Sequence, residues 1–122
     1  MEKKVKSVED LEVFKKSHLL VLKIYELSKL FPSDERYGLI SQIRRAAYSI
    51  PSNLMEGGNR LGSKEYRQFV GIARGSAAEL KYQLLLSKDL GYISIEKYNE
   101  TEIEILEISR MLMGLASTLG RM

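Results

Sequence analysis

Three short breaks divide the sequence into four long stretches, and no other feature constrains the fold as strongly. The breaks are Pro32 with Ser33, the glycine-rich run from Gly57 to Gly62, and Gly91 with Ser94. Between them, apolar residues recur every three or four positions, which is the spacing of one face of an α-helix. Long helices joined by short loops pack as antiparallel neighbours. The sequence therefore predicts an all-α, up-down-up-down antiparallel four-helix bundle.

The predicted helices span residues 8–30, 34–59, 64–90 and 95–119, within one domain that covers residues 1–122. Pro51 lies inside the second helix, where a proline removes one backbone hydrogen bond, so we expect a kink there. Each helix carries one apolar stripe that should face the core. The expected stripes are Leu11, Phe14, His18, Val21, Leu22 and Tyr25; Leu39, Ile43, Ala46, Ala47, Ile50, Leu54 and Gly57; Tyr66, Phe69, Val70, Ala73, Ala77, Leu80 and Leu84; and Ile95, Tyr98, Ile105, Ile108, Leu112, Leu115 and Leu119.

The composition excludes several classes of protein. The chain has no cysteine, so disulfides, thiolate metal sites and a cysteine nucleophile are ruled out together. No apolar run reaches the roughly 18 residues of a membrane span, and the amino terminus lacks the apolar centre of a secretory signal. We expect a cytoplasmic protein that does not associate with a membrane.

Charge is distributed unevenly along the chain. Residues 36–74 hold seven basic and two acidic side chains, a balance of +5, whereas residues 92–122 hold three basic and five acidic, a balance of −2. The middle of the chain is therefore the part suited to an anionic partner.

The residues that could support catalysis are few. His18 is the only histidine and lies on an apolar stripe, which favours a histidine at the edge of the core. Glu104 and Glu107 share a helix face and could hold magnesium, but they lack facing carboxylates, so a solvated acidic face is the preferred interpretation. We expect no catalytic residue, no metal and no cofactor; a magnesium-dependent nucleotide hydrolase remains a third hypothesis.

The third helix carries a ridge of basic residues at seven-residue spacing. Arg67, Arg74, Lys81 and Lys88 form this ridge, and Arg60 and Lys64 precede it. A seven-residue step drifts only about 20° around a helix, so the side chains share one face, roughly a quarter-turn from the core stripe. Gly71 and Ala78 interleave with them. The ridge could follow phosphates, or its small residues could admit a helix of another subunit.

The second helix has a flank of similar character. Tyr37, Ser41, Arg44, Tyr48 and Met55 lie to one side of its core stripe, and Arg45 points further outward. Tyrosine, methionine and arginine are enriched at protein interfaces, and arginine with aromatic rings also suits RNA. Neither flank contains a base-reading motif, so nucleic-acid binding should show little sequence preference.

Several short motifs make the chain resemble the family of 23S rRNA intervening-sequence proteins. They are ERYGL at 35–39, SQIRRAA at 41–47, SIPSN at 49–53, Glu56-Gly57, Arg60, SKEY at 63–66 and Gly91-Tyr92. The resemblance covers roughly residues 10–119, with departures at Asn59 and at Ala77-Ala78. The chain is also distantly similar to the accessory variability protein (Avd) of diversity-generating retroelements.

This resemblance implies a bacterial four-helix bundle that assembles as a homo-oligomer. The retroelement relatives imply a homopentamer that binds a reverse transcriptase and nucleic acid. Because the family has no agreed catalytic residues, none can be transferred to this chain. Arg44, Arg45 and Arg60 match the motif and are the natural candidates for a shared role.

Our leading hypothesis is a non-catalytic homo-oligomer that binds RNA, DNA or a nucleoprotein. The candidate nucleic-acid or partner-binding residues are Arg44, Arg45, Arg60, Lys64, Arg67, Arg74 and Lys81. The candidate interface residues are Tyr37, Tyr48, Gly71 and Ala78. The alternative is a protein-interaction scaffold without nucleic-acid binding, in which the arginines pair between subunits.

Overall fold

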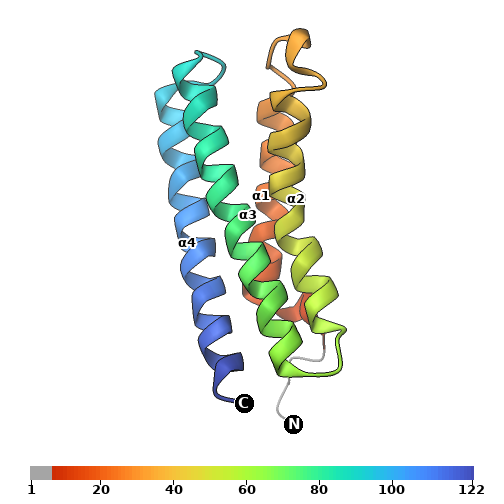
Figure 1. Ribbon diagram of the computed structural model, residues 1–122. Helices are drawn as coiled ribbons and strands as arrows, with labels where there is room; N and C mark the ends of the chain where they lie inside the picture. Colours follow the sequence, from red (N-terminus) through yellow and green to blue (C-terminus); the bar gives the residue numbers. More distant parts are fainter. Residues whose placement is uncertain (1–6) are drawn as a thin grey trace.

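The computed structural model describes residues 7–122, which form four long helices and two short 3₁₀ turns (Figure 1). The elements are η1 (Val8–Asp10), α1 (Glu12–Ser28), η2 (Ser33–Glu35), α2 (Leu39–Gly58), α3 (Ser63–Asp89) and α4 (Ile95–Gly120). No strand occurs in this described part of the chain. The all-α fold with four helices is confirmed. The first six residues of the predicted domain lie outside the described residues.

The helices lie side by side along one long axis. Figure 1 shows the α1–α2 and α3–α4 connections at one end, and the α2–α3 connection and the carboxyl terminus at the other. Helix α3 packs extensively against both α2 and α4, whereas α1 and α4 have the sparsest contact of the four neighbouring pairs. None of the helices in residues 7–122 is long and apolar enough to cross a membrane.

Two of the four predicted helix boundaries are wrong at their amino ends. The first helix begins at Glu12, because Leu11 has an extended backbone that separates it from the η1 turn. The second begins at Leu39 rather than residue 34. Gly38 is not helical, and Glu35 Oε1 accepts the Leu39 backbone N–H at 3.1 Å, so the acidic side chain starts the helix in place of an N-cap residue. The third and fourth helices match their predicted boundaries within one residue.

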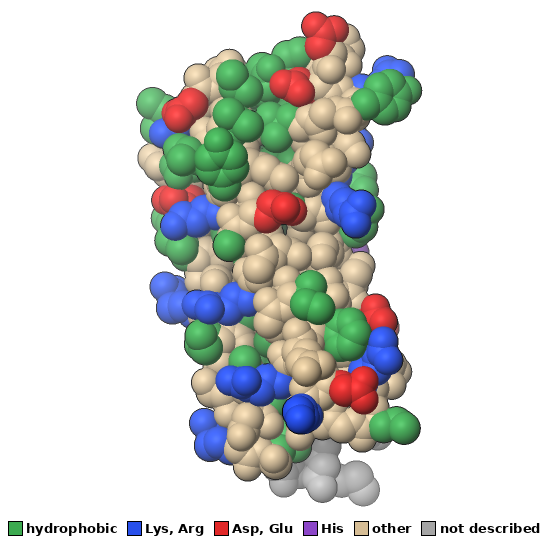
Figure 2. Space-filling model, in the orientation of Figure 1, with side chains coloured by type: hydrophobic (Ala, Val, Ile, Leu, Met, Phe, Trp, Pro, Cys, Tyr) green, Lys and Arg blue, Asp and Glu red, His purple; other side chains and the backbone are tan. Residues whose placement is uncertain are grey.

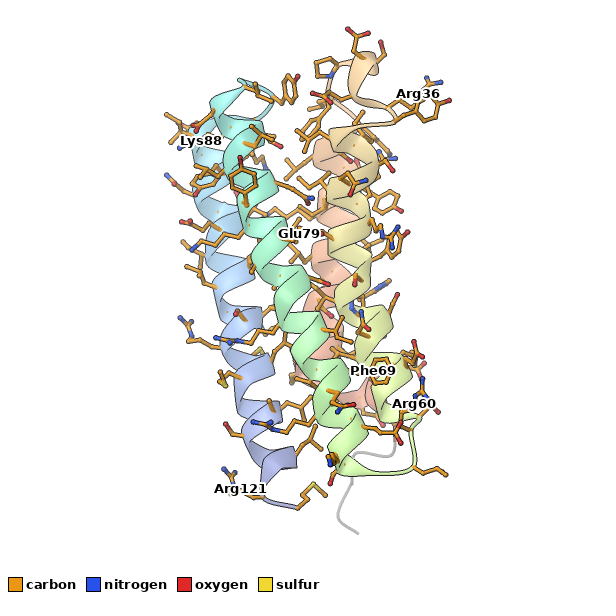
Figure 3. All side chains as sticks on the ribbon, viewed as in Figure 1. Arg36, Arg60, Phe69, Glu79, Lys88 and Arg121 are labelled. Atoms are coloured by element: carbon orange, nitrogen blue, oxygen red, sulfur yellow. The ribbon has the colours of Figure 1, made fainter. Side chains whose placement is uncertain are left out.

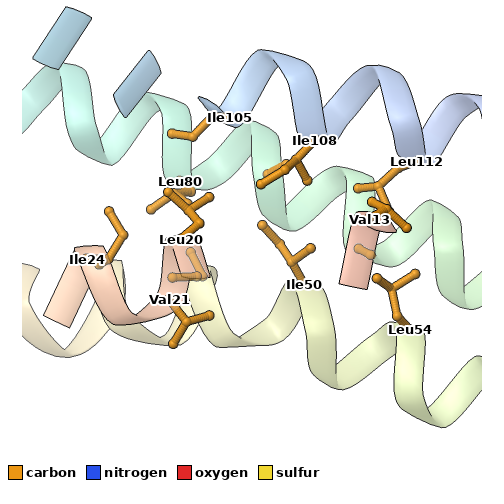
Figure 4. Close-up of a cluster of buried hydrophobic side chains, with 14 of the residues drawn as sticks. Val13, Leu20, Val21, Ile24, Ile50, Leu54, Leu80, Ile105, Ile108 and Leu112 are labelled. Carbon is orange, nitrogen blue, oxygen red and sulfur yellow. The ribbon is translucent and has the colours of Figure 1, made fainter. Parts of the chain in front are cut away.

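The core is formed largely by the predicted stripes of α2, α3 and α4. Side chains from all four helices meet along the centre of the bundle, as Figure 4 shows for Leu20, Ile50, Leu80 and Ile108. The exception in α4 is Ile95, which is exposed at the end of the helix. Burying this apolar surface provides the main driving force for folding.

The predicted core stripe of α1 is partly wrong. Val21 is buried, and Leu11, Phe14 and Tyr25 pack against the core, but His18 and Leu22 are exposed. The buried face includes Val13, Ser17, Leu20, Val21 and Ile24. Ser17 can be buried because its hydroxyl donates to the Phe14 carbonyl oxygen within the same helix, at 2.9 Å. The true stripe therefore includes a polar residue that a hydrophobicity pattern passes over.

Helix α2 continues without interruption through the buried Pro51. The kink predicted at this proline stays a prediction. Two residues beyond it, the Asn53 side-chain amide donates to the Ser49 carbonyl oxygen at 2.8 Å and to Ser49 Oγ at 2.9 Å. Ser49 Oγ also lies 2.8 Å from Ser76 Oγ, so this polar cluster links α2 to α3.

The two loops at one end of the bundle are joined to each other. Helix α3 ends at Asp89 and is followed by Gly91, whose φ of +80° favours glycine, and the Tyr92 N–H donates to the Ser87 carbonyl oxygen. This turn places the Tyr92 ring 5.2 Å from the Phe31 ring and lets the Tyr92 hydroxyl donate to Glu35 Oε2 at 2.9 Å. The loop residues therefore fix this end of α1 and α2 against α3 and α4.

Candidate nucleic-acid interface along α3 and α4

The basic ridge predicted on the third helix lies along the seam between α3 and α4. Near one end, Arg67 Nε donates to the Ala116 carbonyl oxygen of α4 at 3.0 Å. Near the other, Lys88 Nζ lies 4.7 Å from the centre of the Tyr98 ring of α4. These two cations therefore contribute to helix packing, and the free part of the ridge lies between them.

Arg74, in the middle of the ridge, shares a hollow with an arginine of α4. Arg74 and Arg110 line a surface hollow of about 580 Å³ together with Leu106, Ser109, Met113 and Gly114. An adjoining hollow of about 410 Å³ contains Arg74 and Ser109 again, with Gly71, Gly75 and Ala78. Within residues 7–122, neither arginine forms an ion pair, although the charge of Arg110 acts on Glu107 one turn earlier. Two positive charges without an ion pair thus lie beside one hollow.

Arg110 was missed by the sequence analysis. Residues 92–122 were interpreted as acidic because their net charge is −2, but all five acidic side chains of this stretch precede residue 108. Arg110, Gly114 and Arg121 follow at helical spacing, and Ile103, Leu106 and Met113 form an exposed apolar stripe beside them. A helical projection of the second half of this segment alone could have found this face.

Three helix-interior glycines surround the two arginines. A Cβ added at Gly71, Gly75 or Gly114 would meet nothing within 4 Å, so none of the three is required for packing within the chain. A glycine in a helix interior makes the folded protein less stable than an alanine would, by about 0.5–1 kcal/mol. The glycines leave the backbone of both helices accessible at this point.

We define the α3–α4 basic surface as Lys64, Arg67, Arg74, Lys81, Arg110 and Arg121. Lys and Arg side chains gather on the lower part of the molecule over these two helices (Figure 2). Figure 3 places Arg121 at the lower end of α4 and Glu79 near the middle of α3. Lys64 and Lys81 are exposed and, like Arg74, have no ion pair among the described residues.

Arg44 of the second flank is engaged within the chain. Its Nε donates to Ser28 Oγ at 2.7 Å, its Nη2 to the Tyr25 carbonyl oxygen at 3.5 Å, and its guanidinium lies 4.5 Å from the Tyr25 ring centre. A cation at the last carbonyls of a helix is electrostatically favourable, so Arg44 fixes the end of α1 onto α2. Arg45, the next residue, is exposed and forms no ion pair in the described part of the chain.

Arg60 is also engaged locally. It pairs with Glu56 at 2.7 Å and with Glu65 at 3.8 Å, and its guanidinium lies 4.8 Å from the Phe69 ring centre. Figure 3 shows Arg60 beside Phe69, where α2 ends and α3 begins. Arg44 and Arg60, which both belong to the motif, therefore have partners within the chain and stabilise its turns and helix ends.

A second exposed surface is an apolar groove between α1 and α2. The groove has a volume of about 780 Å³ and is lined by Phe14, His18, Val21, Tyr48, Pro51, Ser52, Met55, Glu56, Asn59 and Arg60. His18 therefore lies in this groove rather than at the edge of the core. Tyr48 is a groove residue, as an interface residue would be, whereas Tyr37 lies apart from it between η2 and α2 and is 88% exposed.

The acidic residues of α4 pair with lysines of α1. Lys16 pairs with Glu107 at 2.8 Å, and Lys23 pairs with Glu100 at 2.6 Å and also with Glu104. These carboxylates are still about half exposed to solvent, so the acidic face is solvated as predicted but is also ion-paired with α1. Among residues 7–122, no group of three or more His, Cys, Asp or Glu side chains could hold a metal ion. Glu104 and Glu107, on which the hydrolase hypothesis depended, form ion pairs instead.

These ion pairs shift the pKa of their members. Hydrogen bonding to Lys16, reinforced by its charge, lowers the pKa of the Glu107 carboxyl, and Lys23 lowers that of Glu100 in the same way. The hydrogen bond and charge of Glu107 raise the pKa of Lys16. Burial favours the neutral form of Lys23, but its hydrogen bonds to Glu100 and Glu104 outweigh burial and raise its pKa.

Comparison with known proteins identifies the family. Residues 9–114 match the family described as 23S rRNA-intervening sequence protein. The chain belongs to this family. A crystal structure from Bacteroides thetaiotaomicron VPI-5482, described as a protein of unknown function from the S23 ribosomal protein family, superimposes with a TM-score of 0.79 at 27% identity. The match covers 85% of this chain and 97% of that one. No curated protein sequence matches the chain.

Membership in the 23S rRNA-intervening sequence family confirms the resemblance that the motifs carried. Many of the motif residues lie in α2. The contacts of Arg44 and Arg60 within the chain give these two motif residues a role in packing. Gly57 belongs to the same motif: a Cβ there would lie 2.7 Å from Phe69 Cβ, so the close approach of α2 and α3 requires glycine. The free cations lie mainly outside these motif positions.

Proposed function

We propose that this protein is a non-catalytic bundle that binds RNA or DNA through the α3–α4 basic surface and acts as a homo-oligomer. The observation that carries the proposal is the pair of arginines without ion pairs, Arg74 and Arg110, beside one hollow. Two neighbouring cations repel each other, the nearby Glu107 is already paired with Lys16, and a phosphate backbone would reduce the repulsion. Lys64 and Lys81 extend the positive surface along α3.

The spacing of the surface fits a chain of phosphates. The free ridge residues Arg74 and Lys81 lie one seven-residue step apart, about 10 Å along a helix, and Arg67, one step before Arg74, is held by the Ala116 carbonyl oxygen. Contacts of this kind position a nucleic acid without reading its bases, so we expect little sequence preference. Of the other predicted residues, Arg45 remains free to bind, whereas Arg44 and Arg60 would support binding through the fold.

Binding to structured RNA measured over a salt series tests this proposal. A variant with Lys64, Arg74, Lys81 and Arg110 all changed to Glu should lose affinity, and the salt dependence of its remaining binding should be shallower. Arg36→Glu changes an exposed charge at the opposite end of the molecule and serves as the control (Figure 3). Equal RNA affinity in the fourfold variant and the wild type would refute nucleic-acid binding at this surface.

The second candidate function is a protein-interaction scaffold, and the α1–α2 groove favours it. The groove is largely apolar, and the exposed Tyr48 contributes an aromatic ring of the type enriched at interfaces. A sister subunit or a reverse transcriptase is the partner we propose for testing, as the resemblance implies. Under this alternative, wild-type protein binds no RNA, and the fourfold variant loses its oligomeric state in light scattering.

A further inference from the structure

We propose that the two hollows beside Arg74, one shared with Arg110 and Gly114 and the other lined by Gly71 and Gly75, together form a binding site for a single phosphodiester group. This inference rests on the proposed function and deepens it, because it locates one phosphate contact and assigns its chemistry. It includes Arg110, Ser109, Gly75 and Gly114, which are absent from the sequence-based candidates, and gives Gly71 a role in binding phosphate.

The charges around the hollow match one phosphate. Arg74 of α3 and Arg110 of α4 line the hollow from its two sides, and neither forms an ion pair within the described residues; Glu107, on which the charge of Arg110 acts, is paired with Lys16. A guanidinium can donate two parallel hydrogen bonds to phosphate oxygens. Two guanidinium groups from adjacent helices can therefore hold the oxygens of one phosphate between them.

Ser109 supplies a neutral hydrogen-bond donor at the same place. It lines both adjoining hollows and has no hydrogen-bonding partner within residues 7–122. Its hydroxyl belongs to the group of side chains that commonly bond to nucleic-acid phosphates. We assign Ser109 as a positioning residue that orients a phosphate already attracted by the arginines.

The glycines provide space that the fold itself does not need. Alanine at any of the three positions would contact nothing within the chain and would stabilise its helix, so packing gives no reason for glycine. Glycine would be needed, however, if an external group approached the helix backbone, because glycine allows the closest approach. The three open glycines coincide with the two unpaired arginines at the hollows.

A double-mutant cycle on a labelled single-stranded RNA of mixed sequence tests whether the two arginines hold the same phosphate. Arg74→Gln and Arg110→Gln should each weaken binding several-fold, and the double variant should lose clearly less than the product of the two losses. The salt slope should fall by about 0.7 for the double variant, the value for one phosphate on a single strand, rather than about 1.4. Arg36→Gln should leave both quantities unchanged.

The glycines are tested separately from the charges. Gly71→Leu should weaken RNA binding several-fold while every cation remains, and Gly71→Ala should raise thermal stability. Ser41→Leu also adds apolar bulk, at an exposed position of α2, and should not change affinity. Circular dichroism and light scattering of each variant establish that fold and subunit number are retained.

The outcomes separate this inference from the proposed function. Multiplicative losses, or a fall of the salt slope by about 1.4, would overturn the shared phosphate while nucleic-acid binding stands. Loss of oligomers in Gly71→Leu with RNA affinity retained would assign the hollows to a sister subunit and overturn the inference. A polyglutamate peptide that binds where RNA does not would contradict both proposals, because the site would then select protein carboxylates.

Discussion

At the residue scale, adjacent arginines of the same motif have different surroundings. Arg44 contacts the end of α1 through Ser28 and the Tyr25 carbonyl, whereas Arg45 extends into solvent. The sequence predicted that both residues lie on a flank of the second helix. It could not show the contacts of Arg44, because Ser28 and Tyr25 lie 16 and 19 positions earlier in the chain and approach it only when the helices pack.

Replacing Arg44 should therefore destabilise the fold, and replacing Arg45 should not. Arg44→Ala removes a charge-assisted hydrogen bond and a stacked ring contact, so we expect a loss of about 1–3 kcal/mol in the free energy of unfolding. Arg45→Ala should change it by less than about 0.5 kcal/mol. Urea unfolding followed by circular dichroism measures both. Equal stability of the two variants would contradict the packing role of Arg44.

Glycines in this chain also differ by their surroundings. A Cβ at Gly57 would lie 2.7 Å from Phe69 Cβ and 3.3 Å from the Tyr66 carbonyl oxygen, so Gly57→Ala must push α2 and α3 apart. We expect it to destabilise the protein by about 1–3 kcal/mol. Gly114→Ala meets no atom of the chain and should stabilise it by about 0.5–1 kcal/mol. Thermal unfolding of this matched pair should show shifts of opposite sign.

At the scale of helices, hydrophobic periodicity predicted three core faces correctly and the fourth only in part, because Val21 is buried and Phe14 packs against the core but His18 is exposed. In α2, α3 and α4, residues such as Ile43, Leu80 and Leu112 make the most apolar face also the buried one. Helix α1 is apolar on more than one side, since Leu19 and Leu22 are exposed at 62% and 51%. Periodicity alone cannot choose between two apolar faces, and the buried face contains Ser17, which bonds to its own backbone.

Helix α1 is joined to α4 by ion pairs more than by close packing, and this seam should be sensitive to acid. Lysine partners lower the pKa of Glu100 and Glu107 in the folded protein. A carboxyl with a lowered folded pKa stabilises the protein above its ordinary pKa, and this contribution is lost as the pH falls through the folded value. Stability should therefore decline as the pH drops below about 4.

Urea unfolding across a pH series checks the acid dependence of this seam. The double variant Glu100→Gln, Glu107→Gln should be less stable than the wild type at neutral pH, and the two proteins should converge in acid. Glu96→Gln, at an exposed position without an ion pair among the described residues, is the matched control and should follow the wild type throughout. A constant difference between the double variant and the wild type at every pH would exclude a contribution from the carboxylate charges.

At the scale of the whole molecule, the chain presents two surfaces of different character on different helix pairs. The α3–α4 basic surface carries unpaired cations, and the α1–α2 groove is largely apolar. The sequence predicted Arg74 and Lys81 on the first surface and Tyr48 on the second. It missed Arg110 and the α1 side of the groove, because each depends on which helices become neighbours and on the rotation of α1.

This separation leads to a prediction about assembly. We expect the apolar groove to be covered by another subunit, since a single chain leaves Tyr48 and its neighbours in contact with water. Ser52→Glu places a charge in the groove at an exposed position, so it should lower the mass in light scattering to that of one chain while the helical circular dichroism is retained. Gln42→Glu, outside the groove, should leave the mass unchanged.

The same variant should also weaken RNA binding, although it leaves the α3–α4 basic surface intact. In an oligomer, several basic surfaces act on one strand, and the second contact forms at a high effective concentration. Separating the subunits removes this advantage, so Ser52→Glu should weaken binding to long RNA strongly and to a fragment that spans only one basic surface little. Wild-type protein that scatters light as a single chain would contradict the assembly, and equal loss on both RNAs would show that the groove itself contacts the nucleic acid.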